Sequence, residues 1–201
     1  NLGGGYGVRY TAEDEAIDIP ARLEELVAHL KEETERLGLP MPRFLMEPGR
    51  SIVADAGMTL YTVGSVKRIP GYKQYAAVDG GMTDNPRYAL YQSRYTVYHA
   101  HKSGSLERFD VVGRCCESGD IIQPGVELPG DTCRGDLLAV CTTGAYNYSM
   151  ASNYNRLPRP AVVMLTPDRI YEAVRRETFA DLTALDLSLI HISEPTRLRC
   201  I

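Results

Sequence analysis

Two glycine-containing stretches of this sequence could hold an anion beside a carboxylate. The chain begins NLGGGYG, and adjacent glycines let several backbone N–H groups converge on a phosphate with no Cβ in the way; they are Gly3, Gly4 and Gly5. In EPGR, the pair Pro48 and Gly49 favours a tight turn that could aim Glu47 and Arg50 into one crevice. A glycine run is often only a flexible turn, and a bare Glu is often an ion-pair partner, so both interpretations stay open.

Three stretches further along carry side chains suited to a charged substrate. NPRYALY spaces Arg87 and Tyr91 four residues apart, so that a guanidinium fork and a phenol hydroxyl could hold one carboxylate. VVGRCCESGD places the Cys116 thiol beside the Glu117 carboxylate at the end of an apolar run, facing a loop. TTGAYNYSM puts Tyr146 directly after a Gly-Ala bend. The alternatives are a surface Arg, two small buried hydrophobes and a Tyr-rich packing loop.

The composition is that of an ordinary globular protein and excludes several functional classes. Of 201 residues, 44% are hydrophobic and 24% charged, which suffices for a core in one large or two small domains. The net charge of -4 offers no basic surface for nucleic acid or an anionic membrane, and no apolar run approaches the ~20 residues of a membrane span. The 5 cysteines, two of them adjacent, fit neither a disulfide framework nor a CxxC zinc site. We therefore expect no metal and a reducing, cytoplasmic location.

The first 55 residues have the pattern of one unit of an α/β fold with parallel strands. Helical spacing of apolar residues predicts a helix over residues 20–37 that starts near Pro20 and stops at Gly38. Its apolar face consists of Leu23, Leu26, Val27, Leu30 and Leu37. The apolar run 43–47 is expected to be a buried strand that ends at the EPGR turn.

After residue 55 the pattern changes to that of an antiparallel β domain. Segments rich in Val, Thr and Tyr predict strands at 58–69, 74–80, 95–102, 107–116 and 136–144, separated by Pro-Gly, Gly-Gly, Ser-Gly-Ser and Gln-Pro-Gly turns. Residues 161–177 are expected to form a hairpin, and Thr178 with Asp181 a capping box that starts a last short helix. Residues 187–201 follow with no turn chemistry or packing logic, and we interpret them as a non-native, adapter-derived tail.

Taken together and in this order, GGGxG, EPGR, NPRxALY, CCESGD and GAYxxSM resemble the diaminopimelate decarboxylase group of the fold-type III pyridoxal-phosphate decarboxylases. The likeness runs from Asn1 to about Asp186. It implies the last strands and helix of a (β/α)8, TIM-like barrel in residues 1–55, followed by an antiparallel β-barrel or sandwich domain in residues 56–186. The glycine loop would then lie roughly three-quarters of the way through the barrel. We therefore expect the C-terminal fragment of a longer enzyme, inactive alone, with the lysine that binds the cofactor in the preceding part.

The resemblance also implies roles for individual residues. Pyridoxal 5′-phosphate would be held by Gly3, Gly4, Gly5, Glu47, Pro48, Gly49, Arg50 and Tyr146. The substrate meso-2,6-diaminopimelate, converted to L-lysine and CO2, would be bound by Arg50, Arg87, Tyr91, Glu117 and Tyr146. Glu47 would keep the pyridine nitrogen of the cofactor protonated. Cys116 would donate the proton from the other subunit of a homodimer with shared active sites.

Other members of this superfamily stay open as alternatives. Ornithine and arginine end in a cation only, so a site for them needs distal acid, whereas Arg87 with Tyr91 and Glu117 suits an end that carries both charges. A decarboxylase of carboxynorspermidine is harder to distinguish by this argument. A non-catalytic relative could lose Glu47 or Cys116, but both are present. An amino-acid racemase of the same barrel would place an Arg at the pyridine nitrogen, and Glu47 argues against it.

Overall fold

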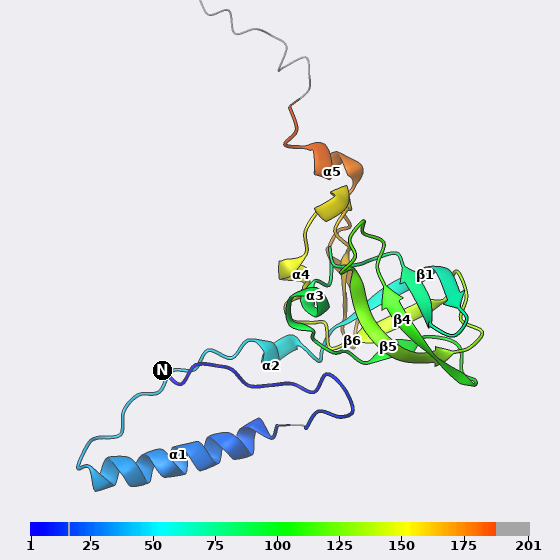
Figure 1. Cartoon of the computed structure of the whole chain (residues 1–201). Coiled ribbons are helices and arrows are strands. Elements are labelled where there is room, and N and C mark those ends of the chain that lie inside the picture. Colours follow the sequence, from blue (N-terminus) through cyan, green and yellow to red (C-terminus); the bar gives the residue numbers. More distant parts are fainter. Residues whose placement is uncertain (16, 188–201) are drawn as a thin grey trace, which may run out of the picture. The chain divides into compact units, whose positions relative to one another are not determined.

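The computed structural model describes residues 1–15 and 17–187 (Figure 1). By its internal contacts the chain divides into two compact units. The first unit comprises Asn1–Ala151, and the second begins at Ser152. The domain boundaries expected near residues 55 and 186 concern the barrel and sheet domains of a longer enzyme, so they stay predictions. Among the described residues, no helix is both long and apolar enough to cross a membrane.

Helix α1 (Ile19–Arg36) confirms the helix predicted over residues 20–37. Its start is defined locally, because the Asp18 side chain accepts a hydrogen bond from the Ala21 backbone and Pro20 lies in the first turn. It ends before Gly38, whose φ of +64° is in the left-handed region. No residue of α1 is buried, so its apolar face lies uncovered in this chain.

The strand expected at 43–47 is not formed, and that prediction is wrong. Two backbone hydrogen bonds nevertheless join this segment to the chain start, from Leu2 N to Leu45 O (2.9 Å) and from Glu47 N to Gly3 O (2.7 Å). Residue numbers increase together along the two segments, which is the direction of parallel neighbours. Within the described residues no further strand lies alongside these two segments, and two hydrogen bonds are too few to form a regular β-ladder.

The first unit is built on a six-stranded sheet with the order β3-β6-β1-β2-β4-β5. Its strands are β1 (Met58–Ile69), β2 (Lys73–Val78), β3 (Val97–His99), β4 (Leu106–Val112), β5 (Ile121–Pro129) and β6 (Leu137–Cys141). Four of the five pairings are antiparallel, as expected. The β2–β4 pair is parallel, contrary to the prediction, because the long connection through β3 returns the chain to the same end of the sheet. The end strands β3 and β5 also contact each other, so the sheet is nearly closed.

Two further expectations about strands need correction. The Gln-Pro-Gly sequence is not a turn but lies inside β5, where the pairing register with β4 shifts and Gly125 has a φ of +68°. Strand β4 ends at Val112 and not at Cys116, so the cysteine pair lies in a loop. In both cases glycine marks an irregularity that periodicity alone does not locate.

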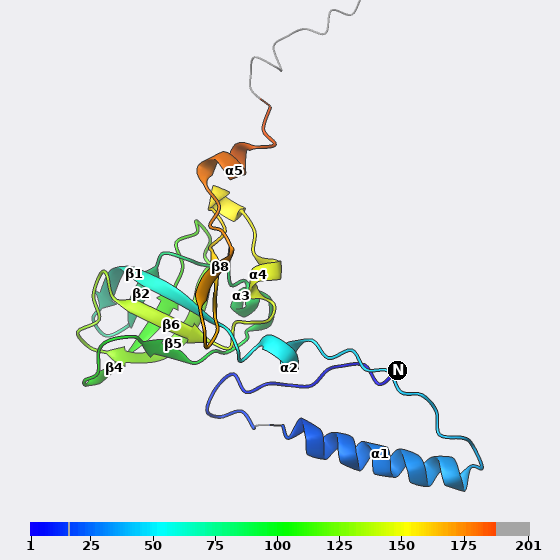
Figure 2. The same cartoon turned by 180° about the vertical axis from the view of Figure 1, so that it is seen from behind.

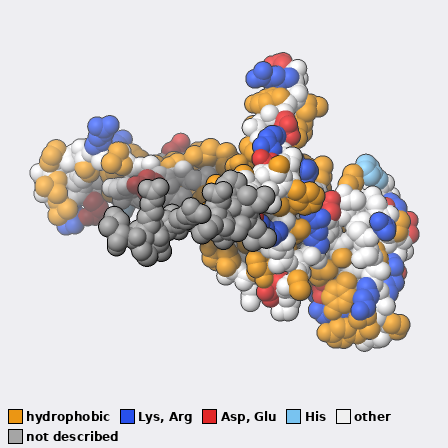
Figure 3. Space-filling view, turned by 90° about the horizontal axis from the view of Figure 1, so that it is seen from above, with side chains coloured by type: hydrophobic (Ala, Val, Ile, Leu, Met, Phe, Trp, Pro, Cys, Tyr) orange, Lys and Arg blue, Asp and Glu red, His pale blue; other side chains and the backbone are white. Residues whose placement is uncertain are grey.

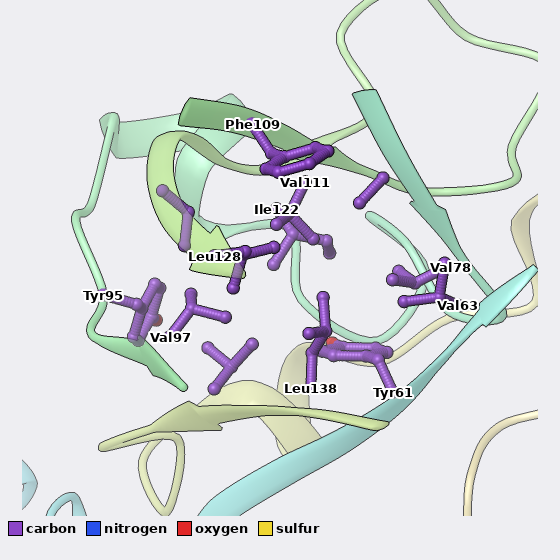
Figure 4. Packing of buried hydrophobic residues seen from close by; sticks show 13 residues of the cluster. Tyr61, Val63, Val78, Tyr95, Val97, Phe109, Val111, Ile122, Leu128 and Leu138 are labelled. Carbon is purple, nitrogen blue, oxygen red and sulfur yellow. The ribbon is translucent and has the colours of Figure 1, made fainter. Parts of the chain in front are cut away.

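Alternate residues of the strands point inward to form one hydrophobic core (Figure 4). Phe109 and Val111 on β4 are completely buried, as are Ile122 and Leu128 on β5. Leu138 on β6 completes the cluster from the opposite side in Figure 4, where it lies beside Tyr61 of β1. This core holds the strands together. The helices of this part of the chain are short: α2 (Arg50–Val53) precedes β1, α3 (Arg87–Tyr91) lies between β2 and β3, and α4 (Asn147–Met150) follows β6.

The second unit confirms the predicted hairpin and capping box. After a short 3-10 helix (Tyr154–Arg156), strands β7 (Val162–Leu165) and β8 (Ile170–Val174) pair antiparallel; β8 is labelled in Figure 2. Helix α5 (Phe179–Thr183) starts with the reciprocal hydrogen bonds between Thr178 and Asp181. Apart from Leu187, the predicted non-native tail lies outside the described residues.

Because Leu128 is completely buried, Leu128→Ala should lower the free energy of unfolding by about 2–5 kcal/mol. Leu106 on the paired strand is 58% exposed, so Leu106→Ala should change that free energy by less than about 0.5 kcal/mol. Urea denaturation followed by circular dichroism measures both. Equal losses in the two variants would contradict the position of the core.

Candidate active site

The glycine run lies against the backbone of EPGR. A Cβ on Gly4 would come within 1.6 Å of the Glu47 carbonyl oxygen and 2.6 Å of the Pro48 nitrogen, so only glycine fits there. A Cβ on Gly3 or Gly5 would meet no described atom within 4 Å. One side of the run is therefore fixed by close packing, and the other has room for a bound group.

Glu47 is held at this loop through the first residue of the chain. Asn1 Nδ2 donates to Glu47 Oε1 (2.5 Å), and Asn1 Oδ1 accepts from Gly3 N (2.8 Å). The Glu47 side chain remains exposed. Its carboxylate is thus linked through Asn1 to the start of the glycine run and is accessible to a cation or an N–H donor.

Tyr146, the residue directly before α4, reaches the same place from nearly 100 positions later in the sequence. A Cβ on Gly49 would lie 2.7 Å from the Tyr146 hydroxyl oxygen, so the phenol passes directly over this glycine. The Arg50 guanidinium carbon lies 6.0 Å from the centre of the Tyr146 ring and 5.8 Å from that of Tyr10. Arg50 therefore contacts two aromatic rings, an arrangement that favours a cation and limits its rotamers.

A tight backbone crossing holds Tyr146 near EPGR. Gly144 N donates to Ala54 O (3.0 Å), and Thr143 N donates to Gly57 O (3.0 Å). A Cβ on Gly144 would lie 1.8 Å from the Val53 carbonyl oxygen, so the two segments can approach this closely only with glycine there. The crossing fixes the end of α2 against the loop that leads into α4.

Arg87 and Tyr91 meet on α3, as their spacing predicted, with the Arg87 guanidinium carbon 5.3 Å from the Tyr91 ring centre. Arg87 is only 5% exposed, although Tyr91 is 62% exposed. Its Nη2 donates to Ser93 Oγ (3.4 Å), while its buried Nε has no hydrogen-bond partner. No carboxylate in the described part of the chain forms an ion pair with Arg87.

Two more buried polar side chains lie beside Arg87. Burial raises the pKa of Tyr95, and the positive charge of Arg87 nearby acts against that rise. Asn147 on α4 also approaches the Tyr95 hydroxyl. Neither that hydroxyl nor the Asn147 amide makes a side-chain hydrogen bond of ordinary geometry within the described residues. The surroundings of Arg87 therefore contain several unused hydrogen-bonding groups.

Cys116 and Glu117 lie in the loop after β4, and the two adjacent thiols differ. Cys116 is exposed, whereas Cys115 is half-buried; burial, followed by the nearby Asp120 carboxylate, raises the pKa of the Cys115 thiol. Glu117 N donates to Cys115 O (2.8 Å), and Ser118 Oγ donates to Glu117 Oε1 (3.3 Å). The exposed thiol is the one that the motif singled out as a proton donor.

The predicted residues thus fall into three groups: the glycine run with EPGR and Tyr146, the Arg87–Tyr91 pair, and the Cys116–Glu117 loop. Sequence reasoning missed Tyr10, which follows the glycine run closely and could have been noticed as a tyrosine near a candidate anion site. Its ring packs at 88° against Tyr95 with centroids 5.4 Å apart. Tyr10 therefore connects the first group to the second, since it contacts both Arg50 and Tyr95.

The chain that carries this nearly closed sheet and these side chains also matches a known protein family. Residues 16–144 match the family described as "Pyridoxal-dependent decarboxylase, C-terminal sheet domain". The chain belongs to this family, and the expected membership is confirmed.

Relatives and solved structures narrow the similarity further. The chain is 50% identical over 189 residues to the diaminopimelate decarboxylase of Bacillus subtilis (strain 168), covering 93% of this chain and 43% of that protein. It is 44% identical over 192 residues to the diaminopimelate decarboxylase of Halalkalibacterium halodurans, covering 94% and 44%. A crystal structure of diaminopimelate decarboxylase from M. jannaschii matches with a TM-score of 0.87 at 32% identity, covering 94% of this chain and 43% of that chain. The chain therefore spans less than half the length of these relatives.

The backbone crossing at Gly144 provides a test of how Tyr146 is positioned. Gly144→Ala forces a Cβ against a carbonyl oxygen and should lower the free energy of unfolding by about 1–3 kcal/mol, the usual cost of overpacking. Gly104→Ala is the control, because its Cβ would meet no described atom within 4 Å. The melting temperatures of the two variants are compared by thermal denaturation. Equal melting temperatures would contradict the close backbone crossing at Gly144.

Proposed function

We propose that this chain is the C-terminal part of a pyridoxal-phosphate-dependent decarboxylase that converts meso-2,6-diaminopimelate to L-lysine and CO2. One observation carries the substrate assignment: Arg87 is buried without a carboxylate partner in the described part of the chain. A buried cation without a counter-charge is unfavourable, so the site is suited to an anionic ligand. The carboxylate at the distal end of diaminopimelate would supply that charge. The names of the two relatives above support the same substrate.

The residues of the first group fit pyridoxal 5′-phosphate. The room beside Gly3 and Gly5 suits a phosphate, whose oxygens would accept from the backbone N–H groups of Gly4 and Gly5, since that of Gly3 donates to Asn1. Glu47, oriented and accessible there, would bind the protonated ring nitrogen. When bound, the cofactor supplies an electron sink for the pair left by the departing CO2. Arg50 and Tyr146, with the Pro48–Gly49 turn between Glu47 and Arg50, would complete the enclosure.

The chain's own side chains would bind both ends of the substrate. Arg87 would hold the distal carboxylate through a bidentate fork, assisted by the Tyr91 hydroxyl and by Arg50. Glu117 would pair with the distal ammonium group, and Tyr146 would contact both substrate and cofactor. These roles follow the family resemblance and are consistent with the exposure of Glu117, Tyr91 and Tyr146.

Cys116 would supply the proton that replaces CO2. As the C–C bond to the carboxylate breaks, its electron pair stays with the substrate carbon, and the thiol proton is transferred to that carbon. The exposed position of Cys116 suits transfer to a substrate outside its own loop. Cys115, half-buried and with a raised pKa, would serve as packing.

We further propose the assembly in which these residues would work. Residues 1–55 would form the last elements of a TIM-like barrel, and residues 56–186 the sheet domain with its extension. Two such subunits would form a cytoplasmic homodimer in which Cys116 serves the partner's site. Exposed hydrophobic side chains support this assembly, because other parts of it would cover them. They reach the surface at several places in Figure 3, and Leu37 on α1 and Leu60 on β1 are 55% and 59% exposed.

The assay uses a full-length protein, because the chain spans 43% of its Bacillus subtilis relative. Residues 1–186 are fused behind the preceding portion of that relative, and CO2 release from meso-diaminopimelate is measured with added pyridoxal phosphate. Ornithine and arginine serve as competing substrates. A soluble fusion protein that releases CO2 from either of them, but not from diaminopimelate, would overturn the substrate assignment.

In this fusion protein, Arg87→Lys should weaken transition-state binding by on the order of 1–3 kcal/mol, because a Lys cannot fork onto a carboxylate. Most of the effect should appear in KM for diaminopimelate. Arg94→Lys is the control, since the Arg94 side chain is 68% exposed. An unchanged KM in the Arg87 variant would remove Arg87 from the site.

The adjacent cysteines should behave differently. Cys116→Ala should lower kcat by roughly 10²–10⁴, the usual contribution of a positioned general acid. Cys115→Ala should spare kcat and reduce only the melting temperature. Steady-state kinetics and thermal melting of both variants test this, and equal losses of kcat would contradict the assignment of roles.

A further inference from the structure

Asp120, the last residue of CCESGD, has a buried carboxylate that joins two loops. The residue is 5% exposed. Its Oδ1 accepts a hydrogen bond from Met82 N (2.6 Å), and its Oδ2 accepts one from Cys115 N (2.6 Å). Its own backbone closes the second loop, because Gly113 N donates to Asp120 O (2.9 Å).

Two glycines leave room for this carboxylate. A Cβ on Gly81 would lie 2.7 Å from Asp120 Oδ2, and a Cβ on Gly113 would lie 2.2 Å from the same oxygen. The three described atoms nearest to either Cβ all belong to the Asp120 carboxyl group. Neither glycine has a φ in the left-handed region, so Asp120 accounts for the absence of a side chain at both positions.

The first loop is held from its other side by a second carboxylate. Gly81 N donates to Asp84 Oδ1 (2.9 Å), and the Tyr61 hydroxyl donates to Asp84 Oδ2. Burial raises the pKa of Asp84, and the nearby Asp120 charge acts in the same direction. The loop that leads to Arg87 is therefore fixed between two carboxylates, one from its own chain segment and one from the CCESGD loop.

The geometry points to Asp120 as a positioning residue that sets the Arg87 loop and the Cys116 loop relative to each other. This inference rests on the proposed function, in which Arg87 binds substrate and Cys116 donates the proton. Met82 lies five positions before Arg87, and Cys115 directly precedes Cys116, so a shift at either hydrogen bond reaches a functional side chain. Only Asp satisfies both N–H groups: in Asn the amide nitrogen would face one of the two donors, and Glu is one methylene longer.

The main test is Asp120→Asn in the fusion protein, with Asp131→Asn as the control because the Asp131 side chain is 73% exposed. Loss of one buried hydrogen bond to a charged group should lower kcat/KM about 10- to 100-fold, with KM raised and kcat lowered together. The control should keep both values. A purely structural role would lower the melting temperature and the yield of folded enzyme but leave KM unchanged.

A second readout needs no catalysis. In a Cys115→Ala background, the rate at which iodoacetamide alkylates Cys116 is followed by mass spectrometry of the peptide that contains it. Asp120→Asn should change this rate at least about fivefold, whereas Asp131→Asn should not. If the rate changes but no variant is an active decarboxylase, the positioning role stands and the proposed function fails.

Gly81→Ala covers the case in which Asp120→Asn does not fold. Its Cβ should slow turnover when Asp120 is present and add little on an Asp120→Ala background, because the clash partner is then absent. Additive effects of these two substitutions would overturn the inference. Unchanged alkylation and unchanged KM in folded Asp120→Asn protein would overturn it as well.

Discussion

Buried carboxylates supply the hydrogen bonds that the loops around the candidate site cannot obtain from strands. A backbone N–H group buried without a partner costs free energy comparable to a lost hydrogen bond. The N–H groups of Gly81, Met82 and Cys115 would face this cost, and each donates instead to Asp84 or Asp120. The arrangement explains why glycines adjoin these carboxylates. It also explains how both loops are held in place without regular secondary structure.

The residues around the glycine run meet the sheet through a small number of close contacts. The Tyr10 carbonyl accepts from Thr96 N (3.2 Å) and from Thr96 Oγ1 (2.8 Å), beside the start of β3. The Tyr10 ring then packs on Tyr95 and contacts Arg50. Together with the crossing at Gly144, these contacts bring EPGR and Tyr146 together, although about 100 residues separate them in the chain.

The most distinctive charge in the candidate site is the Arg87 guanidinium, which is buried and has no carboxylate partner among the described residues. The Arg87 guanidinium is buried beside Tyr95 and stacked on Tyr91, so its orientation is limited before any ligand arrives. Under the proposed function, the substrate carboxylate would offset the cost of keeping this charge out of water. A substrate end that carries only an amine would leave that cost unopposed, so under the proposed function Arg87 would discriminate against such substrates.

The sequence by itself determined the elements that depend on neighbours a few positions apart. The cap at Asp18 and the apolar spacing define α1, alternation defines β1, and Thr178 with Asp181 defines the start of α5. The five motifs likewise identified the family and most of the candidate residues. Tertiary structure alone decided the end of β4, the continuation of β5 through Gln-Pro-Gly, the parallel β2–β4 pair and the contacts of Tyr10 and Asp120. Each of these depends on atoms from segments distant in the chain, such as the Asp120 oxygens against Gly81, and no local pattern of residues encodes such a contact.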